Sequence, residues 1–400
     1  MRASLPKRAN DLIAAVDVSG KRSPVQWPLL VVGAAGLATV SATAFSHGGW
    51  RLALLPIIGA VAGWTLQRAA FGFSSAWRAL LTAGQTVGVR AQLVMVSMTI
   101  VLFFPLLWVG EVGGQVLFGF VNPVGVALAL GAFLFGIGMQ LGGGCGSGTL
   151  YTAAGGSART LVTLAAFIAG SVLAAADVGG WSRWPTVGVF DLRASLGTLP
   201  SLALFLILIG FVYGVLLRLE RRRTGRAEPI GSLAFPIRGR WSLLAAAMAL
   251  SAVNVATLLL SGQPWGITSA FALWGSKIVA LAGVDVANWP YWTGDPALGA
   301  SVFADATSVT NFGLMLGAFS AAAIAGTFRW APRLPLRTIA ASVTGGLLMG
   351  FGARLATGCN IGAFFSGMAS GSVHGILWLA FALVGCAVGI RFSQTIMRAA

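Results

Sequence analysis

Two of the three cysteines in this 400-residue chain lie in a duplicated motif. Residues 136–148 read GIGMQLGGGCGSG and residues 350–362 read GFGARLATGCNIG, and the copies align without a gap at an offset of 214 residues. Six positions are identical: Gly136/Gly350, Gly138/Gly352, Leu141/Leu355, Gly144/Gly358, Cys145/Cys359 and Gly148/Gly362. Because cysteine is rare in this chain, two cysteines in register indicate an internal duplication.

A cysteine among glycines can present its thiol and neighbouring backbone amides to one small anion. Glycine permits close approach of the backbone, and a helix N-terminus directs N–H groups and the positive end of its dipole at an anion. A thiol in apolar surroundings stays neutral and is a weak donor, which suits an anion better than a thiolate does. We therefore assign these residues to a substrate path: Gly144, Cys145, Gly146, Gly148, Gly358, Cys359, Asn360 and Gly362. The alternative is that both cysteines are small apolar residues packed against glycine-rich turns.

The other candidate functional side chains, two cations and the third cysteine, have no matching residue in the other copy of the motif. Lys277 lies in the apolar stretch FALWGSKIVALAG, where an ionisable residue is a functional candidate, although its stem can also snorkel to the interface. Arg354 precedes Cys359 and either adds positive potential or caps a helix end; its counterpart in the first copy is Gln140. Cys386 has no counterpart at the repeat offset, so we expect no transport role for it.

Motifs for chemical catalysis are missing from the sequence. It contains no carboxylate pair, no Ser–His–Asp set, no phosphate-binding loop and no zinc-ligand spacing. We therefore expect neither an enzyme nor a bound metal or cofactor.

Composition identifies the class of protein that must position these residues. Hydrophobic residues make up 57% of the chain and charged residues 9%, with a mean hydropathy of +0.85, whereas soluble domains carry about 25% charged residues. We expect an all-α polytopic membrane protein embedded in a lipid bilayer. The net charge of +16 comes from arginines in short loops, as the positive-inside rule requires, and does not indicate nucleic acid as a partner.

Apolar stretches near the length of about 20 residues that a bilayer requires predict about ten transmembrane helices. They are residues 28–45, 51–66, 91–109, 123–141, 160–176, 201–217, 242–260, 308–327, 338–356 and 372–390. The arginine-rich loop 218–240 then lies in the cytoplasm together with both termini.

This arrangement predicts an inverted pseudo-two-fold repeat, because a unit with an even number of spans is followed by one linking helix. The expected parts are a cytoplasmic tail (1–27), an extra transmembrane helix (28–49), a first half-repeat (50–199), a linking helix with a basic loop (200–241) and an inverted half-repeat (242–400). Four short apolar segments read as re-entrant half-helices: residues 71–77 (FGFSSAW), residues 265–271 (WGITSAF), and those following the two motif cysteines. Such backbone is tolerated at membrane depth only where protein or a water-filled cavity surrounds it.

The duplicated G-x-G-x-x-L-x-x-G-C-x-x-G, together with PWGITSAFALWGSK and FGFSSAW-R, resembles the YeeE/YedE family of bacterial inner-membrane sulfur transporters over residues 50–390. The resemblance implies an hourglass of re-entrant helices and uptake of a small sulfur-containing anion, thiosulfate in the best-known members, between path-lining cysteines. It also implies a soluble TusA-like sulfur carrier at the cytoplasmic face. Gly72 stands where many members have a further cysteine, and we place Gly72 and Gly266, both in the short segments, on the path.

Three alternatives remain open from the sequence. The substrate can be a selenium compound or another sulfur oxyanion. The protein can be a membrane-embedded sulfur-transfer protein that passes a cysteine persulfide to a carrier, with Arg354 or Lys277 as the cation that a reactive thiolate needs. A passive channel or structural subunit is the third.

Overall fold

The computed structural model describes residues 23–398 except 238 and 331–332, so most of the expected N-terminal tail lies outside the described residues. Within them, nine helical segments are long and apolar enough to cross a bilayer, which makes this a multi-pass membrane protein. Their helices are α1 (Trp27–Ala69), α3 (Val87–Val109), α4 (Val126–Gly142), α6 (Ala158–Ala176), α9 (Thr198–Thr224), α10 (Leu243–Ser261), α12 (Ala306–Ala325), α13 (Leu336–Leu355) and α15 (Val373–Arg398). The all-α prediction is confirmed.

The first helix accounts for the difference between nine segments and about ten predicted spans. Helix α1 is broken at Gly48 and Gly49, whose dihedrals are not helical. Its first arm packs with Gly33 against Ser320 of α12, and its second arm packs Gly59 and Gly63 against α12. Along the first arm the contacts run toward the N-terminus of α12, from residue 320 to 316. Along the second arm they run toward its C-terminus, from residue 310 to 314. The two arms therefore run in opposite directions and form a hairpin. The two predicted spans 28–45 and 51–66 are these arms.

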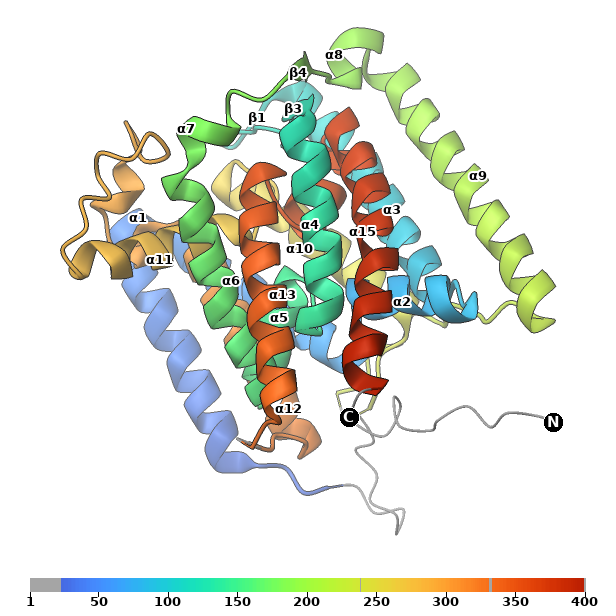
Figure 1. The fold of residues 1–400 in the computed structure, drawn as a ribbon, viewed down its shortest axis with the longest axis horizontal. Coiled ribbons are helices and arrows are strands. Elements are labelled where there is room, and N and C mark those ends of the chain that lie inside the picture. The colour runs from blue at the N-terminus through green and yellow to red at the C-terminus, as the bar shows by residue number, and fades with distance from the viewer. Residues whose placement is uncertain (1–22, 238, 331–332, 399–400) are drawn as a thin grey trace.

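The long helices pack at glycine-rich crossings. Helix α13 packs between α6 and α4, and α4 packs on α15, as the nearly parallel helices of Figure 1 show. A methyl group on Gly350 would overlap the carbonyl oxygen of Phe167, and one on Gly136 would overlap that of Ala382. Glycine is therefore required for these backbones to approach so closely.

Helix α9 stands at the edge of the bundle (Figure 1) and exposes most of its apolar surface. It ends in Arg221–Arg223 and is attached to α3 by a buried ion pair, in which Arg90 Nη2 lies 2.7 Å from Glu220 Oε2. Thr86 donates a 2.6 Å hydrogen bond to the same carboxylate oxygen. This peripheral helix is the one that the sequence predicts as the link between two halves.

Short strands and helices gather at the end of the bundle drawn uppermost in Figure 1. Two antiparallel two-stranded sheets pair Glu111 with Val116 and Val124 with Gly188. The strands are β1 (Glu111–Val112), β2 (Gln115–Val116), β3 (Pro123–Gly125) and β4 (Thr186–Val189), and the nearby short helices are α7 (Val178–Trp181) and α8 (Leu192–Leu196). Two 3-10 turns, η3 (Pro296–Leu298) and η4 (Val302–Ala304), precede α12.

Five further helices are too short to span a bilayer. They are α2 (Phe73–Ala83), α5 (Gly146–Ala154), α11 (Thr268–Leu281), the π-helix η5 (Asn360–Ser366) and α14 (Gly367–Ala369). Helices α2 and α11 lie crosswise to the long helices in Figure 1. Their N-terminal residues are buried, as are all residues of η5 and α14. They coincide with the four short segments that the sequence singles out, and they place the motif cysteines inside the protein.

Candidate functional site

Cys145 ends the turn between α4 and α5 and is the N-cap of α5. Its sulfur accepts a 3.4 Å hydrogen bond from the Gly148 amide, lies 3.5 Å from Ser147 Oγ, and is approached by the backbone of Phe73 at the start of α2. Gly144 packs tightly on the backbone of Gly148. The first motif therefore surrounds a buried sulfur with donors from two short helices.

Cys359 takes the same position at the start of η5, with 1% of its surface exposed. The backbone of Ile361 and Gly362 faces its sulfur. Before it, Thr357 has φ 54° and Gly358 has φ 146°. The repeat counterpart of Thr357 is Gly143, which also has a positive φ of 83°. Since an L-residue rarely adopts this conformation, the two motifs share the same turn despite their different residues.

The two motifs meet directly. A Cβ on Gly146 would stand 3.2 Å from Cys359 Sγ and 3.5 Å from Thr268 Cγ2 of α11. Standard covalent geometry then places the two cysteine sulfurs no more than about 11 Å apart. The two motifs, more than two hundred residues apart in the sequence, therefore lie side by side inside the protein.

Gly266 and Gly362 lie next to this site. A Cβ on Gly362 would stand 4.0 Å from Gly266 Cα, and the Phe120 ring lies over both glycines. A cavity of about 100 Å³ opens beside Gly266 and is lined by hydroxyl and amide side chains, by the carboxylate of Asp305 and by small or apolar residues. The lining residues are Thr257, Ser261, Gln263, Pro264, Trp265, Gly266, Asp305, Ala306, Thr307 and Thr310. The two glycines thus separate a polar cavity from the cysteines.

Asn360, directly after Cys359, is fully buried, and neither its Oδ1 nor its Nδ2 has a hydrogen-bond partner among the described residues. Burying an amide without a partner costs about 1–3 kcal/mol by mutational measures. A side chain that pays this cost next to a buried thiol is a candidate ligand for a polar substrate.

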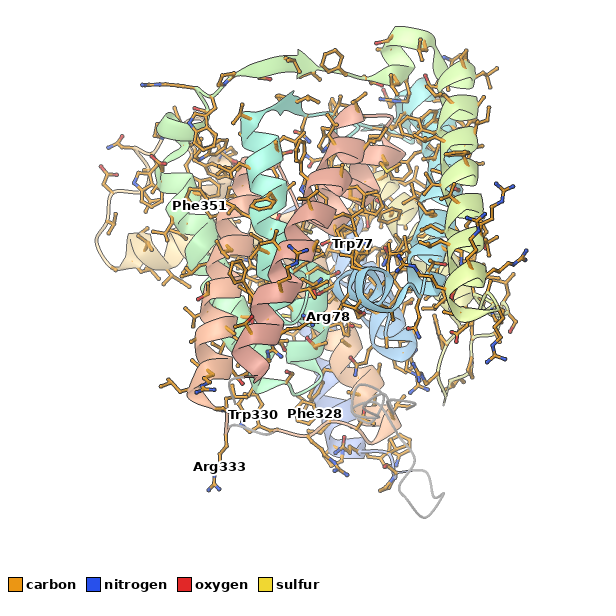
Figure 2. All side chains as sticks on the ribbon, turned by 45° about the vertical axis from the view of Figure 1, so that its right-hand side comes forward. Trp77, Arg78, Phe328, Trp330, Arg333 and Phe351 are labelled. Atoms are coloured by element: carbon orange, nitrogen blue, oxygen red, sulfur yellow. The ribbon has the colours of Figure 1, made fainter. Side chains whose placement is uncertain are left out.

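Aromatic rings of η5, α2 and α15 pack together near the two cysteines. Phe364 of η5 packs edge-on against Phe73 and Trp77 of α2, with ring centroids 6.3 and 6.2 Å apart, and Trp77 also contacts Trp378 of α15. Figure 2 shows Trp77 and Arg78 within the height of the bundle, far from Phe328, Trp330 and Arg333 at its lower end. The thiols therefore lie in apolar surroundings well inside the protein.

A buried guanidinium also belongs to this region. Arg354 is 8% exposed and donates hydrogen bonds to Thr268 Oγ1 at 2.6 Å and to Tyr291 Oη at 2.7 Å. Thr268, Phe120 and Tyr291 were not among the residues that the sequence singles out, although Thr268 lies inside the predicted segment WGITSAF. Only the folded chain brings them beside the motif.

Of the two remaining residues that the sequence assigns to the path, Gly72 lies near the cysteines and Lys277 does not. Gly72 is the N-cap of α2, near the hydroxyl of Tyr151, on the side of Cys145. Lys277 is not brought to the thiols: its ammonium donates to the carbonyl oxygens of Leu298 and Ala300, about 13 Å along α11 from Thr268. The structure thus favours the interpretation that Lys277 reaches away to a loop.

Cys386 lies in the interface between α15 and α4. Its thiol is 3.4 Å from the carbonyl oxygen of Gly136 and is fully buried. The sulfur fills a space between the two helices. Its described partners are the Gly136 carbonyl and the side chains of Gln140 and Arg78, so we expect it to stabilise the contact between the two helices.

Comparison with known proteins gives concordant matches. A family model described as sulphur transport matches residues 68–388. The chain is 28% identical over 340 residues to the thiosulfate transporter TsuA of Spirochaeta thermophila, which covers 78% of this chain and 90% of that protein. It is 25% identical over 348 residues to TsuA of Escherichia coli, with 82% and 91% covered. A probable transporter, YedE of Salmonella typhimurium, is 32% identical over 160 residues, which are only 38% of each chain.

Proposed function

Because the chain belongs to the sulphur-transport family, we propose that it takes up a small sulfur-containing anion, thiosulfate first among the candidates, across the bacterial inner membrane. Relatives that bear the name thiosulfate transporter align over most of their length with this chain, which supports the choice of substrate. The protein is then a transporter and not a sulfur-transfer enzyme.

The architecture that we propose is the inverted repeat, with residues 50–199 and 242–400 as its halves and residues 200–241 as the link. In this arrangement α2 and α5 enter the membrane from the cytoplasm, and α11 and η5 enter it from outside. The contact of Gly146 with Cys359 supports the proposal, because half-helices from opposite sides have their tips at the midplane.

The proposed path starts in the polar cavity and passes Gly266 and Gly362 beneath Phe120. It continues past Cys359 and Asn360 to Cys145, and leaves along α5 and the start of α2. Side-chain hydroxyls, backbone amides and neutral thiols are all donors, and they can replace the water around an anion one after another. The polarizable sulfurs suit the sulfane sulfur of thiosulfate better than hard oxygen ligands do.

One observation carries the proposal. The Cys359 sulfur contacts the backbone directly beside Cys145, so that the two rare residues kept in register by the duplication are also neighbours in space. Packing alone explains two buried cysteines, but it does not explain why equivalent residues of both copies lie close together next to an unpartnered amide.

After release, we propose that a soluble TusA-like carrier receives the sulfur at the cytoplasmic face. The basic end of α9, Arg221–Arg223, and the following loop offer a positively charged surface there. Gly72 supplies no thiol, so the proposed path has two cysteines, without the third that the family resemblance implies.

Uptake of radiolabelled thiosulfate, in a strain that depends on this protein for sulfur, tests the function. Cys145→Ala and Cys359→Ala are expected to lower the initial rate at least about tenfold, which corresponds to a lost interaction of about 1.4 kcal/mol. Serine variants should also transport poorly, because a hydroxyl is harder and more strongly hydrated than a thiol.

Cys386→Ala is the matched control, since it removes an equally buried thiol from a helix–helix interface that is not part of the proposed path, and it should leave uptake unchanged. Parental rates in both serine variants would show that the motif thiols are packing residues. Absence of thiosulfate uptake by the parent protein would refute the choice of substrate.

A further inference from the structure

Arg354 is a buried cation without a counter-ion among the described residues. The residue is 8% exposed, and its hydrogen-bond partners there, Thr268 and Tyr291, are neutral hydroxyls. Nε is buried and has no partner among the described residues. Of the described acidic residues, none forms an ion pair with it, since the ion pairs there are Arg90–Glu220 and Arg193–Asp191.

Arg90 shows how the same protein compensates a buried guanidinium where the charge is structural. Its side chain is 3% exposed, and it is paired at 2.7 Å with the equally buried carboxylate of Glu220. A charge taken out of water without such a partner is costly. In contrast to Arg90, Arg354 has no carboxylate among the described residues to compensate its charge.

Capping of a helix does not explain Arg354. It is the penultimate residue of α13, where a cation can interact with the last carbonyl groups, but its hydrogen bonds go to side chains of other segments. Its repeat counterpart, Gln140, accepts a 2.9 Å hydrogen bond from Arg78 Nε. A guanidinium therefore stands at this position of both motifs, although it comes from a different residue in each.

The position of Arg354 connects it to the thiol site. Thr268 accepts a hydrogen bond from Arg354, and its methyl group lies close to Gly146. The Cys359 sulfur lies close to the same glycine. The Nε–H and one remaining terminal N–H of a guanidinium form an edge that matches two oxygens of an oxyanion. Tyr291 accepts a hydrogen bond from one terminal nitrogen and Thr268 accepts one from the other. These two bonds fix the plane of the guanidinium.

We propose that Arg354 binds the charged oxygens of the transported anion and that this anion is its counter-ion. Its sulfonate oxygens lie on the free edge of the guanidinium, and its sulfane sulfur lies toward Cys359. Thr268 and Tyr291 orient the guanidinium. Selection follows from charge: an oxyanion compensates Arg354, whereas a neutral thiol compound of the same size does not. The assignment rests on the proposed function and adds to it the residue that recognises charge.

The test measures binding and stability in purified protein. Thermal unfolding in detergent is followed with and without sodium thiosulfate for the parent, Arg354→Gln, Arg354→Lys and Arg90→Gln. Thiosulfate is expected to raise the Tm of the parent, by mass action on the folded state. It should leave the Tm of Arg354→Gln unchanged and weaken binding to Arg354→Lys at least tenfold, because lysine keeps the charge but not the planar edge.

The ligand-free proteins give a second, independent result. Arg354→Gln should unfold at the parental Tm or above it, since it removes an uncompensated charge, whereas Arg90→Gln should unfold at a lower Tm because it leaves Glu220 unpaired. A ligand-free Tm of Arg354→Gln well below the parental value, or failure to recover folded Arg354→Gln, shows a structural role and overturns the proposal. So does a thiosulfate affinity of Arg354→Lys equal to that of the parent.

The failure of the proposed function has a different signature. If thiosulfate neither shifts the parental Tm nor enters cells, the substrate is wrong, and sulfate, selenate and phosphate are then tested on the same variants. A parental shift by any of these oxyanions that is lost in Arg354→Gln supports the role of Arg354. An equal shift in the parent and Arg354→Gln, or no shift with any of them, refutes it.

Discussion

Replacing Gly146 by alanine tests whether the space between the two motifs is the path. The added Cβ would stand 3.2 Å from Cys359 Sγ and 3.5 Å from Thr268 Cγ2, so it fills this space and touches both walls. Gly146 begins α5 and is not among the residues with positive φ, and alanine can therefore adopt its conformation.

The expected change in stability is small because two effects oppose each other. Alanine gains up to about 1 kcal/mol over glycine in a helix. Overpacking costs about 1–3 kcal/mol, and the 3.2 Å contact, which requires a shift of only a few tenths of an ångström, belongs at the low end of this range. The free energy of unfolding should fall by about 1 kcal/mol or less, whereas uptake should fall at least about tenfold.

Gly210→Ala in α9 is the matched control, since a Cβ there meets nothing within 4 Å. It should raise stability by up to about 1 kcal/mol and leave uptake unchanged. Uptake rates are compared after normalising to the amount of folded protein in the membrane. Parental uptake by Gly146→Ala would refute the reasoning, because the substrate would then pass elsewhere.

Two further results are expected. Asn360→Leu should raise the free energy of unfolding by about 1 kcal/mol or more, because it removes two buried unpartnered atoms. A thermal or denaturant titration measures this change, and uptake should be abolished. A stability loss with retained uptake would contradict a role of Asn360 in binding. Cysteines introduced at Ala234 and Ala287 should react with a membrane-impermeant reagent from the cytoplasmic and the outer side respectively, and labelling of both from one side would exclude the inverted arrangement.

The sequence was sufficient to predict the helical class and the positions of the crossing segments. When charged residues are scarce, apolar stretches of bilayer length indicate transmembrane helices. The break in α1 is also visible in the sequence, as Gly48–Gly49 between two apolar stretches. The motif cysteines were found for a similar reason. A rare residue that recurs in register is a signal that survives when most of the surrounding sequence has changed.

The partners of those cysteines could not be predicted, because they depend on tertiary packing. Thr268 and Phe120 are ordinary residue types with no repeat signal, and each reaches the site through a contact with a distant segment. Lys277 and Arg354 both looked like isolated cations in apolar sequence. Lys277 is directed to loop carbonyls and Arg354 to the interior, and no pattern in the sequence distinguishes these directions.

The packing of glycines constrains how a substrate can move through this protein. The principal helix contacts join the two proposed halves: α1 with α12, α6 with α13 and α4 with α15. At Gly59 and Gly350 these contacts are backbone against backbone, with no side chain in between that could rotate or slide. Rocking of one half against the other would have to separate interlocked surfaces. Passage is therefore expected to require only local displacements of short helices and side chains, with a rate that depends weakly on temperature and on membrane thickness.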